Sequence, residues 1–205
     1  MNLSGAAFNG SDLTSADFSN SNLSDADFEN TNLSNANLTG ADLSFAVMEG
    51  INLTGATING TSFNYVDDYD TGAIIAQIYS TASYARGNLS GVNYSNDNLA
   101  GVNFSNINLA NATFAGTQLT NASFSGAIIT GAYFSSGSDG GQGLSTTQLT
   151  STASYAIGNL SGITLTGSFD GVNFNNCLLY TSVPRDFHIE PVGEGNVSGV
   201  TEPRA

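Results

Sequence analysis

The chain has 205 residues, and seventeen acidic residues against three arginines give it a formal net charge of −14 at pH 7. A field of this sign repels nucleic acids and anionic lipid headgroups, so we expect neither nucleic acid nor a membrane as a partner. No apolar run reaches about 18 residues, so no membrane-spanning helix is predicted. No basic segment followed by an apolar stretch opens the chain, so we predict no signal peptide. Extracellular, periplasmic and cytoplasmic locations all stay open.

Residues 2–64 repeat in units of five, each with a large apolar residue at its centre and, in most units, a small residue two positions earlier. A period of five holds neither one face of a helix nor one face of a long strand. It fits a coil of short parallel strands, with Gly or Asn at corners where φ is positive. The centres are Leu3, Phe8, Leu13, Phe18, Leu23, Phe28, Leu33, Leu38, Leu43, Met48, Leu53, Ile58 and Phe63.

Leu and Phe tend to alternate at these centres, and this alternation bears on the number of sides in a coil. A coil of twenty residues places Leu23 on Leu3 and Phe28 on Phe8, whereas a coil of fifteen residues places Leu on Phe. The alternation therefore favours an even number of sides without fixing that number at four.

This pattern resembles the pentapeptide-repeat family, whose units run small residue, Asp or Asn, Leu or Phe, and two polar residues. Residues 16–20, 26–30 and 41–45 match it directly. The resemblance implies an all-β fold, a right-handed quadrilateral β-helix with twenty residues in each coil. Such a solenoid is a repeat protein in which each coil contacts only its neighbours.

Two segments interrupt the repeat, at residues 64–86 and 135–157. Residues 77–91 match residues 148–162 at an offset of 71 residues, so the two interruptions are copies of one element. Each begins with a loop rich in glycine or aspartate and continues into a predicted short helix.

Both predicted helices have local support in the sequence. Ile74 and Ile78 lie on one side of the first, and Ser145 with Gln148 forms a predicted capping box for the second. The central residues that flank each interruption are 26 positions apart instead of five, so each insertion is expected to add 21 residues to the five-residue repeat. We therefore expect both insertions to leave the coil as protrusions and to dock identically on the coil that follows.

The five-residue repeat resumes after each interruption, and the repeat domain is predicted to span residues 1–179. Asp97 takes an inward small-residue position, where an unpaired carboxylate would be costly, so we expect it to bond nearby backbone or to bulge outward. Cys177, the only cysteine, also takes an inward position and is interpreted as packing. Residues 180–205 hold all three prolines and are predicted to form a disordered tail without the repeat.

The sequence shows no arrangement of residues that indicates catalysis. The only histidine, His188, lies in the predicted tail and is not part of a recognisable motif with a Ser or Cys nucleophile. Asp67, Asp68 and Asp70 miss the ligand spacing of an EF-hand loop. We therefore predict a protein that is not an enzyme and has no catalytic residue, metal site or cofactor.

Charge is the most informative feature of the predicted surface. Ten of the seventeen acids lie between Asp12 and Asp70, and no lysine or arginine precedes Arg86. Such a field attracts partners with basic surfaces, although outward acids also keep a polar solenoid soluble. The candidate acidic interaction surface comprises Asp12, Asp17, Asp27, Asp42, Asp67, Asp68 and Asp70.

Two function classes follow. The first is a structural or protein-interaction scaffold, with export and end-to-end self-association of the rod as options. The second is implied by the resemblance, because some pentapeptide-repeat proteins mimic DNA, bind DNA gyrase and protect it from quinolones. The chain departs from that group in three ways: its acids are concentrated in one half, its two insertions are longer and nearly identical, and the C-terminal dimerisation element expected of that group is not recognisable.

Overall fold

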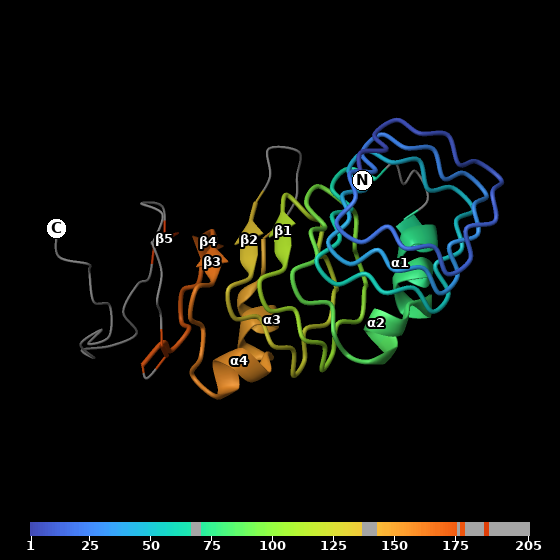
Figure 1. Cartoon of the computed structure of the whole chain (residues 1–205). Helices are drawn as coiled ribbons and strands as arrows, with labels where there is room; N and C mark the ends of the chain where they lie inside the picture. Colours follow the sequence, from blue (N-terminus) through green and yellow to red (C-terminus); the bar gives the residue numbers. More distant parts are fainter. Residues whose placement is uncertain (67–70, 137–142, 176, 179–186, 189–205) are drawn as a thin grey trace, which may run out of the picture.

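The computed structural model describes residues 1–66, 71–136, 143–175, 177–178 and 187–188. The described chain winds as a β-helix solenoid whose coils are stacked from the N-terminal end onward (Figure 1). Parallel bridges join residues twenty positions apart, such as Asn2 to Asn22 and Asn22 to Asp42. One coil therefore takes four five-residue units, which confirms the expected twenty residues.

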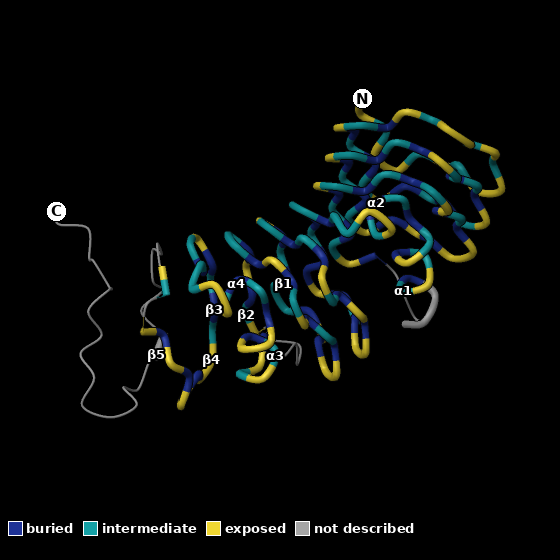
Figure 2. Tube along the Cα trace, turned by 90° about the horizontal axis from the view of Figure 1, so that it is seen from below, coloured by how far each residue is buried: buried dark blue, intermediate teal, exposed yellow. Residues whose placement is uncertain are grey.

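Regular strands are few, because each unit leaves only about three residues between two corners. The three-stranded parallel sheet has the order β1 (Thr113–Ala115), β2 (Tyr133–Ser135) and β3 (Thr164–Leu165), and most other contacts between coils are isolated bridges. Exposed residues gather at the corners (Figure 2). The corners need positive φ: Gly40 has φ +68°, and a Cβ added there would lie 2.6 Å from Asn20 Oδ1.

The core lies inside the coil, where like residues stack on like. Leu23, Phe28 and Leu33 are fully buried, and alanines such as Ala26 fill the small inward positions between them. The ring of Phe28 stacks on that of Phe8, with centroids 5.1 Å apart and planes 16° from parallel. The prediction that Phe lies on Phe in successive coils is therefore confirmed in this part of the rod.

The helices belong to the wall of the coil, so the prediction that they protrude is wrong. Ile78 in α1 (Thr71–Ser80) and Leu149 in α3 (Thr146–Thr150) are buried in the same core as the repeat residues. Each is followed by a one-turn helix, α2 (Ala82–Ala85) or α4 (Ala153–Ala156), and both pairs lie along the same edge of the rod (Figure 1).

Residue spacing shows how the helices fit. Ser62 bridges to Asn93, and Tyr133 pairs with Thr164, so each coil that holds a helix pair has 31 residues. The insertion lengthens its coil by eleven residues, because the helical segment also takes the place of two ordinary units. A helix rises about 1.5 Å per residue and a strand about 3.3 Å, so a helical path needs about twice as many residues for the same length.

The two helix pairs dock in the same way, as the shared sequence predicts. Gly55 N donates to Ser80 O at 2.9 Å, and Gly126 N donates to Ser151 O at 2.9 Å. These bonds join the helices to the coil that precedes them, which was not expected. The helices also contact the coil that follows, as expected, because the hydroxyl of Tyr84 donates to Asn103 O at 2.8 Å.

The predicted capping box is confirmed at the start of α3. Gln148 N donates to Ser145 Oγ at 3.3 Å, and Ser145 N donates to Gln148 Oε1 at 2.9 Å. In the first insertion the equivalent Gln77 accepts from Leu53 N instead, at 3.0 Å. Gln148 also bonds the neighbouring coil, because its Nε2 donates to Leu119 O at 2.8 Å and to Ala122 O at 3.0 Å. Both glutamines therefore tie their helix to the coil before it, and Gln148 also caps its own helix.

Three further expectations concern single positions. Asp97 is buried at its inward position and does not bulge outward. The burial of Tyr94, and then the charge of Asp97, raises the pKa of Tyr94. Cys177 is half-buried against the core, as expected for packing, and burial raises the pKa of its thiol. Within the predicted tail, β5 (Phe187–His188) pairs with β4 (Gly167–Ser168), and the rest of residues 180–205 lies outside the described residues.

Candidate acidic interaction surface

Four predicted surface residues, Asp12, Asp17, Asp27 and Asp42, share one local geometry. In each, Oδ1 accepts from the backbone N–H two residues later, which closes the turn at the corner of the coil. The distance is 3.1 Å from Thr14 N to Asp12, 3.0 Å from Ser19 N to Asp17, 2.9 Å from Glu29 N to Asp27 and 3.0 Å from Ser44 N to Asp42. These carboxylates therefore have a structural role as well as a charge.

Further donors surround the first two carboxylates. Asn32 Nδ2 lies 3.2 Å from Asp12 Oδ1, and Asn37 Nδ2 lies 3.1 Å from Asp17 Oδ1. The hydroxyl of Thr14, and then its N–H, lowers the pKa of Asp12 below the ordinary 3.8. The N–H of Ser19, and then its hydroxyl, lowers the pKa of Asp17 in the same way. Both groups are therefore held as carboxylates at neutral pH.

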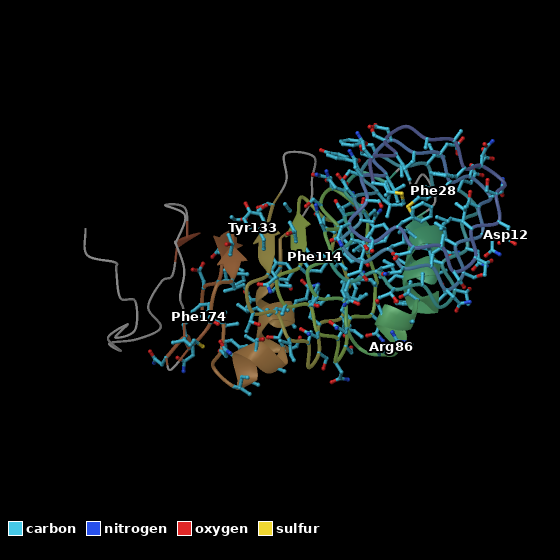
Figure 3. All side chains as sticks on the ribbon, viewed as in Figure 1. Asp12, Phe28, Arg86, Phe114, Tyr133 and Phe174 are labelled. Carbon is cyan, nitrogen blue, oxygen red and sulfur yellow. The ribbon has the colours of Figure 1, made fainter. Side chains whose placement is uncertain are left out.

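The four carboxylates do not converge on one place. Asp12 bridges to Asn32 and Asp17 to Asn37, while Asp27 lies between Ala7 and Val47 and Asp42 between Asn22 and Ser62. Each acid thus lies on a different ladder of the coil, as a coil of twenty residues predicts for these positions. Asp12 lies at the outer edge of the first coils, and Phe28 lies inside them (Figure 3). The arrangement is a charged band around the rod, and we call these four residues the acidic band.

Metal chemistry receives no support from the described part of the chain. Across those residues, no group of three or more His, Cys, Asp or Glu side chains could hold a metal ion. None of the described helices is long and apolar enough to cross a membrane. The other predicted surface residues, Asp67, Asp68 and Asp70, lie outside the described residues.

Sequence reasoning missed one surface feature beside the acidic band. Phe45 and Tyr65 are both exposed, and their rings stack with centroids 5.3 Å apart. The signal was present in the sequence, because both residues stand at corner positions where other units have Gly, Asn, Asp or Ser. With a coil of twenty residues, two such departures twenty positions apart must lie on neighbouring coils.

Comparisons with known proteins agree with the repeat. The family model described as pentapeptide repeats matches in eight copies over residues 2–40, 36–67 and 98–135, which together are just over half of the chain. No curated protein sequence matches.

Several solved structures are similar to parts of the chain. A trypsin-treated form of QnrB1, a plasmid-mediated fluoroquinolone resistance protein, is 18% identical, with 64% of this chain and 76% of that chain covered and a TM-score of 0.32. Rfr23, from the cyanobacterium Cyanothece 51142, is 20% identical, with coverage of 59% and 86% and a TM-score of 0.33. HetL, from the cyanobacterium Nostoc sp. strain PCC 7120, is 23% identical, with coverage of 62% and 61% and a TM-score of 0.25.

Proposed function

Since the chain belongs to the pentapeptide-repeat family, we propose that it is a non-enzymatic scaffold whose acidic band binds partner proteins through their basic surfaces. In this proposal residues 1–179 form one right-handed β-helix of quadrilateral cross-section, with one five-residue unit on each side. The twenty-residue spacing of the bridges supports four units in each coil.

One observation carries the proposal: the turn that Asp or Asn closes in the first repeat block, residues 2–66, is closed by Asn in the second, residues 88–135. Asn93 Oδ1 accepts from Ser95 N at 2.9 Å and Asn103 Oδ1 accepts from Ser105 N at 3.0 Å, as Asp17 does from Ser19 N. The coil therefore forms with a neutral acceptor at this position and does not need a negative charge; Ala7 and Val47, which bridge to Asp27, take the same position with no side-chain oxygen at all. The charge of the acidic band is available for interaction with a partner.

The distribution of the acidic band favours binding over catalysis. Chemistry that uses a pair of carboxylates, as acid and base or as metal ligands, needs both groups within reach of one reacting centre. The four carboxylates lie on four different ladders, so they cannot all face one small molecule. A partner with an extended basic surface can contact carboxylates on successive coils.

The test is a binding titration with a small basic protein at several salt concentrations. We expect weak binding that fades as the Debye length falls from about 10 Å at 0.1 M salt to about 3 Å at 1 M. The matched control is an acidic protein of similar size, which should not bind at either concentration. Binding that ignores both salt and the sign of the partner's charge would contradict the proposal.

A DNA mimic that binds gyrase is the second candidate, and one observation favours it. The acidic band surrounds the rod, as phosphates surround a duplex, because its members lie on four different ladders. The charge does not continue along the rod, since Asp97 is the only acid within residues 88–135 and it is buried. A gyrase supercoiling assay distinguishes the two candidates: tight, salt-resistant inhibition would favour the mimic over the scaffold.

A further inference from the structure

The exposed rings of Phe45 and Tyr65 form a flat pair on one corner of the rod. Phe45 is 52% exposed and Tyr65 is 43% exposed, and their planes are 11° from parallel. The backbone holds them in place: Phe45 N donates to Asn64 O at 3.0 Å, and Tyr65 N donates to Ser95 O at 3.3 Å. Each ring therefore covers one face of the other and leaves apolar area open to solvent.

The backbone at both positions is unusual for an aromatic residue. Phe45 has φ 62° and Tyr65 has φ 52°, in the left-handed region that disfavours bulky side chains. Among the residues that the structure describes, the other non-glycine residues with positive φ are Asn, Asp or Ser. The next coil has Asn96 at the corresponding corner, with φ 64°. Residues held in such conformations cluster at functional sites, because folding alone does not favour them.

The charge around this pair has one sign. Asp25 takes the same corner one coil before Phe45, and its N–H donates to Ser44 O at 2.9 Å. Asp25 is exposed, and residues 1–66 contain no lysine or arginine. Val47, 38% exposed, adds apolar surface on the ladder that also holds Asp27. An apolar, π-rich surface beside carboxylates is complementary to a group that is both flat and cationic.

We propose that the Phe45–Tyr65 pair, with Asp25 beside it, is the place where the rod binds arginine side chains of a basic partner protein. The guanidinium group stacks flat on the open face of a ring, and the neighbouring carboxylate accepts its N–H groups. Lysine binds less well there, because its compact ammonium group is more strongly hydrated and cannot stack. This inference rests on the proposed binding of basic proteins and names the part of the surface that selects arginine.

The test compares two peptides on the full chain. One is a short arginine-rich peptide, and the other has the same sequence with lysine in place of every arginine. Wild-type protein should bind the arginine peptide about two- to fivefold more tightly, as a cation–π contact at an exposed site predicts. Phe45→Asn with Tyr65→Asn should remove this preference and leave weak, salt-dependent binding of both peptides.

Folding controls are built into these variants. Asn suits positive φ, so the double variant should melt at or above the wild-type temperature, and a loss of binding cannot then arise from unfolding. Tyr133→Thr is the matched control: it removes a different exposed aromatic and introduces the residue found on both neighbouring strands, Thr113 and Thr164. It should keep the arginine preference.

Each other outcome overturns the inference in a distinct way. Equal binding of both peptides by wild-type protein, or an unchanged preference in the double variant, would contradict it and leave the proposed function intact. Failure to bind either peptide would contradict the proposed function as well. Binding of a neutral oligosaccharide that the double variant loses would assign the rings to a sugar instead.

Discussion

The first and second repeat blocks, residues 2–66 and 88–135, share one coil geometry and differ in charge. The second block has one acid, Asp97, and that acid is buried. Both blocks close their corners with the same side-chain-to-backbone hydrogen bond, from Asp or Asn in the first and from Asn in the second. Shape and charge are therefore specified separately in this chain. The acids of the first block are Asp12, Asp17, Asp25, Asp27, Glu29, Asp42 and Glu49, with Asp67, Asp68 and Asp70 following.

The largest effect tests whether the two cores are equivalent. Phe28 and Phe114 are both fully buried, and each stacks on a Phe one coil away. Phe28→Ala and Phe114→Ala should each cost about 3–5 kcal/mol of unfolding free energy, because each leaves a large cavity. Denaturant unfolding measures both. Ser24→Ala, at an outward position, is the control and should cost less than about 0.5 kcal/mol. Equal losses for Ser24→Ala and Phe28→Ala would contradict the inward and outward assignment.

A smaller effect tests whether the helix pairs are equivalent parts of the two blocks. The buried hydroxyls of Ser83 and Ser154 accept from Ile58 N and Ile129 N, both at 2.9 Å. Ser83→Ala and Ser154→Ala should each cost about 1–3 kcal/mol, since a buried N–H loses its acceptor. Thermal unfolding of the two variants should give matching shifts. A loss at one site only would show that the insertions are bound differently.

A near-zero effect is expected when the charge difference is reversed. Asn103 is exposed, and its Oδ1 closes a corner in the second block as Asp17 does in the first. Asn103→Asp should change the unfolding free energy by less than about 0.5 kcal/mol, because the carboxylate offers the same acceptor. A large destabilisation in denaturant unfolding would show that the second block requires a neutral side chain.

The smallest effect concerns pH. The folded pKa of Asp12 and of Asp17 lies below the ordinary 3.8, so the folded state binds fewer protons than the unfolded state there. Their contribution to stability is full above pH 3.8 and is lost as the pH falls through the lowered pKa values. Asp12→Asn should therefore flatten the fall in melting temperature below pH 3.8. An unchanged acid profile would contradict the turn geometry of Asp12.

Much of the fold could be predicted from the sequence because a period of five repeats so many times. The inward positions of Phe28 and Ala26 and the outward position of Asp12 follow from that period alone. The capping box of Ser145 and Gln148 was predictable because it depends on residues three apart. The path of the helices was not predictable, because the sequence gives the number of residues in an insertion and not the distance that they span. A helical residue advances less along the chain than a strand residue, so a long insertion can still fit within one coil.

The candidate surface was predictable in position and less so in geometry. Alternation places Asp17 and Asp42 on the outside, but the hydrogen bond from Ser19 N to Asp17 depends on the backbone of the corner. The pairing of Phe45 with Tyr65 requires the coil length, since the two are neighbours only when one turn takes twenty residues. Features that follow from the repeat, such as the stacking of Phe28 on Phe8, were therefore accessible to pattern reasoning, and the hydrogen bonds at the corners were less so.

The most direct measurement replaces the four acids of the acidic band together, with Asp12, Asp17, Asp27 and Asp42 all changed to Asn. Wild-type and variant proteins are then compared for thermal unfolding at pH 7 and for binding of a small basic protein at 0.1 M salt. We predict only a small decrease of the unfolding midpoint, from the lost contribution of Asp12 and Asp17, and clearly weaker binding by the variant, because Asn offers the coil the same acceptor oxygen while the partner needs the charge. A variant that unfolds at a much lower temperature, or that binds the basic protein as wild type does, would contradict the separation of shape from charge.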